Sequence, residues 1–425
     1  MTRNDGGIGP PKLRDPCACV KRSRTLPLVH PLLALALVLI AGIGVTRLTL
    51  PALHHPLLDG VIETGVPFVL LGALLGPGLG ILDGRTLRVL DPLTALGIGW
   101  VGASFGARLE WRMLRRVSGR TWLVGAALAV PVLLTTGATA WALARSVQPL
   151  GDAWGRPFPA VALILAGAAT TAASWRGQKL GRRNALLDTA FGTAAAAVGV
   201  AWYHPHLALR SIALTVLAAA ALGGLFAGFV RWQDDRTDVG VGVALTGVIV
   251  AGAGFTYATQ LSPFVVCALI AALGVSFSPA AVRVSVQRAL RRWEVPLYAA
   301  FLIIAGALLQ RFTPWLLPAA GLLAVIRAAV RWVTVRFGLD QMDPIWRSLP
   351  FPPPREFAFP VMRQGAAAVA LAAGFDFVRG GAGGTGGGGG GGGAVFLTVL
   401  LSVLAAEAIV VLTPLTAAPR HVEVS

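Results

Sequence analysis

Apolar segments long enough to cross a lipid bilayer recur along almost the whole of this 425-residue chain. A helix needs about 20 predominantly apolar residues to span the hydrocarbon core. About thirteen segments approach that length, at approximately residues 28–46, 64–82, 92–107, 121–144, 158–175, 184–203, 208–230, 239–259, 262–278, 294–310, 314–335, 360–378 and 394–418. Because unpaired backbone groups are costly in lipid, such segments must be helices. The sequence therefore predicts an all-α polytopic membrane protein with about 13 transmembrane helices.

The charged residues are few and support the same class. They make up 13% of the chain, and the formal net charge is +17. The basic residues lie in short clusters between the apolar segments, and no zinc finger or other nucleic-acid-binding module is visible. We therefore expect this charge to face anionic lipid headgroups, and we expect no nucleic-acid partner. The three cysteines, Cys17, Cys19 and Cys267, predict neither a disulfide framework nor a metal site, and no cofactor is expected.

When the loops are assigned to alternate sides of the membrane, the arginine-rich ones fall on the same side. This predicts the orientation of the protein in the membrane. One set of loops holds Arg108, Arg112, Arg115, Arg116, Arg120, Arg176, Lys179, Arg182, Arg183, Arg283, Arg288, Arg291 and Arg292. The positive-inside rule puts these loops and the C-terminus in the cytoplasm, with a prokaryotic inner membrane as the expected location. The basic N-terminal tail, residues 1–27, falls on the other side. Either the tail is translocated despite its charge, or one early segment does not cross.

The spans divide into two six-span halves of opposite topology. We place the halves at 28–203 and 239–418, joined by a linking helix and loops at 204–238, with a short tail at 419–425. Each half ends in a small-residue segment followed by a span that carries an acid, Asp188 in the first and Glu407 in the second. Inverted repeats with a site at their interface have this arrangement, although small residues also mark ordinary helix packing. The glycine-rich run 379–394 is predicted to be a linker.

The stretch from residue 167 to 200 contains the leading candidate site. It opens as an apolar span, turns polar at Thr170 and Thr171, and re-enters an apolar helix that carries Asp188. An acid inside a membrane segment must stay neutral, find a partner or hold a cation, so it marks a functional site. Interrupted helices supply ion ligands in transporters. The alternative is that Asp188 reaches the headgroups or pairs with a loop arginine.

Other polar residues in the later spans are secondary candidates. Arg327 lies in the middle of an apolar segment, where burial of its charge requires an internal partner. Arg331 follows one turn later, so the pair could instead extend toward the cytoplasmic surface. Glu407 is placed to close a salt bridge, whereas we expect Asp376 to lie near the outer interface in contact with water. The loops lack converging groups for catalysis, so a transporter is expected and not an enzyme.

Several stretches, taken in order, resemble the monovalent cation:proton antiporter superfamily. LLGALLGPGLGIL at 70–82 is similar to the family's second-span glycine-proline signature, and LGIGWVGASFGARLEWRMLRR resembles the following span with its arginine-rich exit. QLSPFVVCALIAALGVSFS and EVPLYAAFLIIAGALLQ resemble two later spans, IRAAVRWVTVRFG looks like a span with a buried arginine, and RQGAAAVALAA looks like the second interrupted helix. The resemblance covers nearly the whole chain.

The resemblance implies a homodimeric secondary transporter that exchanges protons for Na⁺ or K⁺ by alternating access. It implies Asp188 as the ion-binding carboxylate, Thr170 and Thr171 as ligands at the helix break, and Arg327 as the buried arginine. When the chain is aligned on the preceding Gly-Arg instead, the family's ion-binding aspartate falls near Gly192, one turn beyond Asp188. The chain departs from the family at this site, because the usual paired acid reads Leu187–Asp188 and the usual Thr-Asp reads Thr171–Ala172. The missing acid favours one-for-one exchange. It also keeps open a transport-inactive relative with a binding or sensing role.

Overall fold

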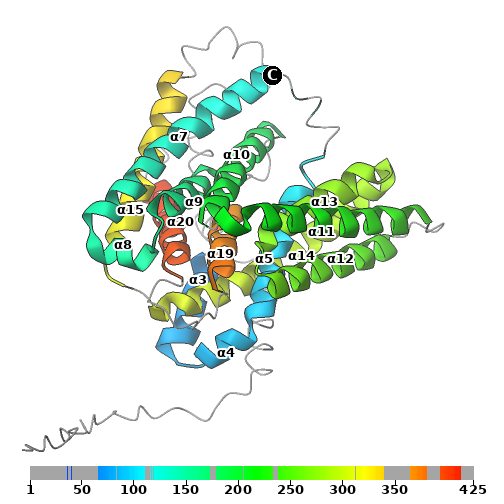
Figure 1. Ribbon diagram of the computed structural model, residues 1–425, viewed down its shortest axis with the longest axis horizontal. Helices are drawn as coiled ribbons and strands as arrows, with labels where there is room; N and C mark the ends of the chain where they lie inside the picture. Colours follow the sequence, from blue (N-terminus) through cyan, green and yellow to red (C-terminus); the bar gives the residue numbers. More distant parts are fainter. Residues whose placement is uncertain are drawn as a thin grey trace, which may run out of the picture.

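The computed structural model describes residues 36, 40, 66–82, 84–110, 115, 117, 119–172, 179–203, 205–232, 238–311, 313–338, 364–380 and 393–412. All regular structure in these ranges is helical, and the helices assemble into a polytopic bundle (Figure 1). The predicted first span, 28–46, lies outside the described ranges apart from residues 36 and 40, and so do the tail 1–27 and the tail 419–425. Each of the remaining predicted spans coincides with a described helix. The all-α fold class is confirmed.

The helices follow the apolar segments in chain order. They are α3 (Val66–Ala73), η2 (Leu74–Gly78), α4 (Gly84–Val89), α5 (Asp91–Gly106), α7 (Gly119–Ser146), α8 (Gln148–Trp154), α9 (Phe158–Thr170), α10 (Lys179–Tyr203), α11 (Pro205–Trp232), α12 (Asp238–Thr259), α13 (Pro263–Phe277), α14 (Ala280–Ala307), η3 (Leu308–Arg311), α15 (Leu316–Val333), η4 (Thr334–Gly338), α19 (Ala366–Gly380) and α20 (Ala394–Leu412). Prolines in the first turns of α5, α9 and α13 suit these starts, because that turn has no internal acceptor for an N–H.

A subset of the described helices is long and apolar enough to cross a membrane. These are Thr121–Ser146, Leu186–Tyr203, Ala208–Trp232, Asp238–Thr259 and Leu316–Arg336. Shorter apolar helices are Pro67–Gly78, Phe158–Thr170, Pro263–Phe277 and Ala394–Ile409. The short helices α9 and α13 are largely buried against their neighbours. A helix that is enclosed by protein does not need to match the thickness of the hydrocarbon core.

The helices pack in two groups. One group contains α7, α8, α9, α10, α15 and α20, and the other contains α3, α5, α11, α12, α13 and α14 (Figure 1). Helix α19 contacts both groups, because it packs on α9 and α20 and also on α5 and α13. Large apolar side chains on α11 and α12 face outward, as at Leu209, Val239 and Val243. Such exposed apolar surface suits contact with lipid and not with water.

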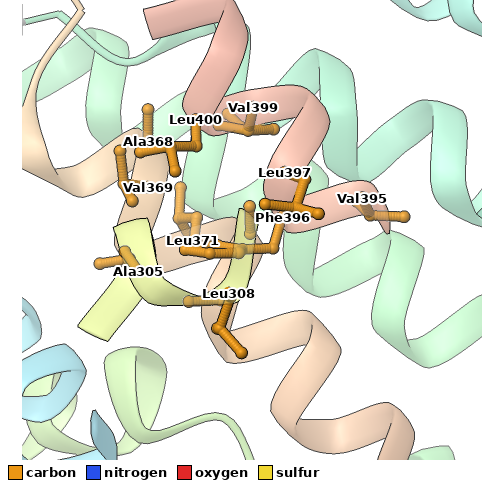
Figure 2. Close-up of a cluster of buried hydrophobic side chains, with 14 of the residues drawn as sticks. Ala305, Leu308, Ala368, Val369, Leu371, Val395, Phe396, Leu397, Val399 and Leu400 are labelled. Carbon is orange, nitrogen blue, oxygen red and sulfur yellow. The ribbon is translucent and has the colours of Figure 1, made fainter. Parts of the chain in front are cut away.

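Apolar packing fixes α19 and α20 in the middle of the fold. Figure 2 shows side chains of α19 and α20 gathered with Ala305 of α14 and Leu308 of η3 in one cluster. Leu371 and Leu397 are among its almost fully buried members. This packing joins the two helix groups, and it holds α19 so that residue 364, which precedes the helix, lies inside the protein.

The last linker differs in detail from its prediction. We expected the glycine-rich linker to begin at residue 379, but α19 remains helical to Gly380. Arg379 explains the extension, because its Nη1 donates a 2.6 Å hydrogen bond to the carbonyl of Trp154 and holds the last turn of α19 against α8. Residues 381–392, and the proline-rich connection at 340–360, lie outside the described residues. The division into the halves 28–203 and 239–418 stays a prediction.

Candidate functional site

The site is built around the C-terminal end of α9. The helix stops at Thr170 because Thr171 adopts an extended conformation, with φ −61° and ψ 138°. The hydroxyl of Thr170 donates to the carbonyl of Gly167 at 2.7 Å, and that of Thr171 donates to the carbonyl of Ala168 at 2.8 Å. Helix C-termini leave their last carbonyls without partners inside the helix. The end of α9 therefore presents carbonyl oxygens to the protein interior.

Two arginines of α15 meet these carbonyls. Arg327 donates from Nε to the carbonyl of Ala169 at 2.6 Å and from Nη2 to that of Thr171 at 3.2 Å. Arg331, one turn later, donates from Nη2 to the carbonyl of Thr170. The partial negative charge of a helix C-terminus stabilises nearby cations. Arg327 therefore has internal partners, as its place in an apolar segment required, and the carbonyls of Ala169 and Thr171 are among them.

Asp188 of α10 lies beside the same helix end. Its carboxylate is only 1% exposed, and Oδ2 accepts a 2.8 Å hydrogen bond from Nη1 of Arg331. The other oxygen, Oδ1, is buried and has no hydrogen-bond partner among the described residues. Asp188 thus neither extends to the surface nor pairs with a described loop residue. Its partner comes from a membrane helix that follows it by 143 positions in the chain.

A close approach of α9 and α10 brings Asp188 to this position. Gly167 and Gly192 face each other, and a β-carbon at Gly192 would collide with the Gly167 carbonyl and with Oγ1 of Thr170. The apolar part of α10, Leu186–Tyr203, contains this contact and packs along α9. Asp188 precedes Gly192 by one turn on the same face, since residues four apart are neighbours on a helix. The glycine pair therefore sets how close the carboxylate comes to the end of α9.

Glu407 completes a set of opposing buried charges, which we call the buried charge cluster: Asp188, Arg327, Arg331 and Glu407. Arg327 interacts electrostatically with both Asp188 and Glu407. All four residues are at most 4% exposed. Removing charges from water is costly unless they are paired and hydrogen-bonded. The two acids balance the two arginines, so the cluster as a whole carries no formal charge when every member is ionised.

The structure thus brings Asp188, Thr170, Thr171 and Arg327 together, with Glu407 on a helix that packs on α15. Sequence reasoning missed two members of the site. It considered Arg331 only as a surface-directed neighbour of Arg327, although their four-residue spacing on an apolar helix could have indicated a shared buried face. It gave no role to Gln364, which is 5% exposed and whose Nε2 donates to the carbonyl of Ala168 at 3.1 Å. Ion binding by the two threonines stays a prediction.

The expectation that Asp376 contacts water was wrong. Its side chain is 7% exposed, and Oδ2 accepts a 3.0 Å hydrogen bond from the backbone N–H of Phe396, in the first turn of α20. A carboxylate at a helix N-terminus is stabilised by the unpaired N–H groups and by the helix dipole. Hydropathy placed Asp376 near the end of its span, but the start of α20 folds over it and excludes water. Asp376 is therefore a helix-capping residue.

Comparisons with known proteins identify the fold. No protein-family model matches the sequence, and no curated protein sequence matches it. Among solved structures, the chain is similar to the sodium proton antiporter MjNhaP1 from Methanocaldococcus jannaschii at pH 8, with a TM-score of 0.58 and 12% sequence identity. The match covers 90% of this chain and 98% of that one. This chain therefore has the all-α fold of a sodium proton antiporter.

Proposed function

We propose that this chain is a secondary transporter that exchanges protons for a monovalent cation, Na⁺ or K⁺, across a membrane by alternating access. The fold that it shares with a sodium proton antiporter supports the class of function. The observation that carries the proposal is the buried carboxylate of Asp188, with one oxygen held by Arg331 and the other without a partner among the described residues. Ionisable groups buried in membrane segments mark ion and proton pathways.

In this proposal a proton and a cation compete for one oxygen of the site, Oδ1 of Asp188. Oδ1 of Asp188 accepts a proton or ligates a cation, and the two events exclude each other because they use the same lone pairs. Arg331 holds the carboxylate in place through Oδ2 and balances its charge when Oδ1 is empty. In this proposal Thr170 and Thr171 add oxygen ligands at the helix end, since a hydroxyl that donates to its own helix keeps lone pairs for a cation.

Alternating access requires the site to open to each side in turn. The charge cluster lies within the group formed by α7, α8, α9, α10, α15 and α20, which packs against the second helix group. Helix α19 passes close to the N-terminal end of α13, because a β-carbon at Gly374 would lie 2.7 Å from Oγ of Ser262, the residue before α13. We propose that the helix group that contains Asp188 (α7, α8, α9, α10, α15 and α20) moves as a unit relative to the second helix group. Small residues at such crossings let the helices approach closely.

The expected setting is a multi-pass protein of a prokaryotic inner membrane, with a cytoplasmic C-terminus and a homodimeric assembly. The membrane class has support from the apolar helices and from the shared fold. The orientation rests on the arginine-rich loops, and the dimer on the family resemblance. Cross-linking of the protein in native membranes checks the dimer, and labelling of single cysteines introduced into the loops checks the orientation.

The test is proton flux in proteoliposomes that contain a pH-sensitive dye, with NaCl or KCl added outside. The wild type should alkalinise the lumen, because each cation that enters is exchanged for a proton that leaves. Asp188→Asn should abolish this response, because an amide neither exchanges a proton nor supplies the negative charge. Asp376→Asn is the matched control: it also removes a buried acid, but its amide oxygen still accepts the Phe396 N–H, so flux should persist. Normal flux in Asp188→Asn would remove the assignment.

A second candidate is a transport-inactive relative that binds a ligand or partner. The observation that favours it is the ion pair itself, because Arg331 already compensates the charge of Asp188 within the protein. A protein that is folded and incorporated, yet shows no flux with Na⁺, K⁺ or Li⁺ across a broad pH range, would support this candidate. Cation-dependent flux in the wild type would exclude it.

A further inference from the structure

We propose that Gln364 is a ligand of the transported monovalent cation and acts together with Asp188. The inference rests on the proposed function, and it assigns a binding role to a residue of the segment that precedes α19. Gln364 and Gly365 are not helical, and the helix begins at Ala366. The side chain of Gln364 is nevertheless buried at 5% exposure.

The two ends of the Gln364 amide have different surroundings. Nε2 donates to the carbonyl of Ala168 at 3.1 Å, which anchors the side chain to the last turn of α9. Oε1 is buried and has no hydrogen-bond partner among the described residues. An amide oxygen has two lone pairs, and burial without a donor removes the water that would have satisfied them. An electron-poor occupant near Oε1 would restore that interaction.

Asp188 presents a second oxygen of the same kind. Its Oδ1 is also buried and without a partner among the described residues. Both side chains are held at the last turn of α9, Gln364 directly through Ala168 and Asp188 through Arg331, which donates to Thr170. Two side chains with a buried acceptor oxygen each, from two elements, are therefore anchored at the same helix end, which itself presents carbonyl oxygens.

Oxygen ligands of this type suit hard cations such as the alkali-metal ions. The formal charges of the buried charge cluster cancel, so a divalent cation would leave two uncompensated charges in the interior, whereas a monovalent cation leaves one. A proton on Asp188 leaves the same single charge. Gln364 supplies an oxygen without changing this balance, which is the property expected of a ligand that sets affinity and selectivity without affecting proton binding.

Three substitutions separate a ligand role from a structural one. Gln364→Glu keeps acceptor oxygens but loses the donor to the Ala168 carbonyl. Gln364→Lys keeps a donor and loses the acceptor, and Gln364→Leu loses both. The measurement is the cation concentration that gives half-maximal proton flux in proteoliposomes, together with the maximal rate. Thr256→Val is the control, because Thr256 is a buried residue of α12 whose hydroxyl donates within its own helix, to the carbonyl of Ala253.

A ligand role predicts that Gln364→Leu raises the half-saturating cation concentration about tenfold or more, with a maximal rate within about twofold of the wild type. Gln364→Glu should bind the cation at least as tightly as the wild type, and Thr256→Val should not differ from it. If Gln364→Leu does not fold, Gln364→Met carries the same prediction, since its side chain is uncharged, is close to glutamine in length and also lacks the acceptor oxygen. A purely structural role predicts a different result, with Gln364→Glu as impaired as Gln364→Leu, because both lose the donor to the Ala168 carbonyl.

Failure of the inference is distinguishable from failure of the proposed function. Wild-type flux with unchanged half-saturation in Gln364→Leu and Gln364→Lys would overturn the ligand role and leave the antiporter proposal intact. If the wild type moves no cation, calorimetric titration of the purified protein with NaCl and KCl tests whether Gln364 takes part in cation binding. Binding heat in the wild type that is lost in Gln364→Leu would support the site in a protein that does not transport. Equal heat in both proteins, or no heat in the wild type, would overturn it.

Discussion

Arg331 Nη1 lies 2.8 Å from Asp188 Oδ2, and neither side chain is more than 1% exposed. The same guanidinium donates to the carbonyl of Thr170 at the end of α9. One arginine thus joins three helices, α15, α10 and α9. Because a buried charge without its partner is far more costly than a neutral pair, this relationship leads directly to predictions about stability.

Arg331→Met should lower the free energy of unfolding by about 3–5 kcal/mol, because it leaves the Asp188 carboxylate buried without its counter-ion. The double variant Asp188→Asn/Arg331→Met should recover much of this loss, since no buried charge is then unbalanced at this pair. Thermal or denaturant unfolding of the purified protein in detergent measures both. Arg288→Met is the control, because its ion pair with Asp238 is at the surface and should matter little. Equal effects of the two single substitutions would contradict the buried pair.

Arg327→Lys should also destabilise the protein, although the charge is kept. The guanidinium reaches the carbonyls of Ala169 and Thr171 at once with two of its nitrogens, whereas lysine has a single ammonium nitrogen that cannot occupy both positions. A buried carbonyl that loses its donor costs about 1–3 kcal/mol. The unfolding midpoint of the variant gives the measurement. Unchanged stability would show that the charge of Arg327 matters and its shape does not.

Gly192→Ala should destabilise the site, because the added methyl group would collide with the Gly167 carbonyl and with Thr170 Oγ1. Overpacking of this kind costs about 1–3 kcal/mol, and separation of α10 from α9 should reduce cation-dependent flux as well. Gly247→Ala on α12 is a matched control, since a β-carbon at Gly247 would meet no described atom within 4 Å. Alanine in a helix interior is favoured over glycine, by up to about 1 kcal/mol, so this variant should be as stable as the wild type or more so.

Exchange should be one-for-one and therefore electroneutral. The reason is that one acid, Asp188 beside the end of α9, binds a proton and a cation in turn. Arg327, Arg331 and Glu407 keep the same ionisation state throughout the cycle. Flux measured in proteoliposomes at imposed membrane potentials of either sign should be the same as at zero potential. Acceleration of exchange by a membrane potential would mean that more than one charge moves in each cycle.

Asp376→Ala should destabilise α20 by about 1 kcal/mol, the usual cost of losing a helix cap. Asp376→Asn should cost less, because the amide oxygen still accepts the Phe396 N–H. Unfolding midpoints of both variants provide the comparison. Equal effects of Ala and Asn would indicate that the charge of Asp376, and not its hydrogen bond, stabilises the helix.

Much of the fold was predictable because lipid leaves the chain few choices. Apolar segments such as 121–144 and 208–230 must be helical in a bilayer, and their lengths locate them to within a few residues. The acid of α10 and the polar break at Thr170 were visible for the same reason, since a polar group in an apolar segment stands out. The start of the last linker was less predictable, because the contact between Arg379 and Trp154 extends α19 into the glycine-rich run.

The partners of the polar residues were decided by the tertiary structure alone. Sequence patterning reports whether a position prefers lipid, water or protein, but it carries no information on which distant helix lies opposite. Hence Asp188 could be identified as a buried acid while its pairing with Arg331, the anchoring of Gln364 on Ala168 and the burial of Asp376 under α20 could not. Each of these contacts depends on how helices from distant parts of the chain cross, and that is fixed by the packing of the whole bundle.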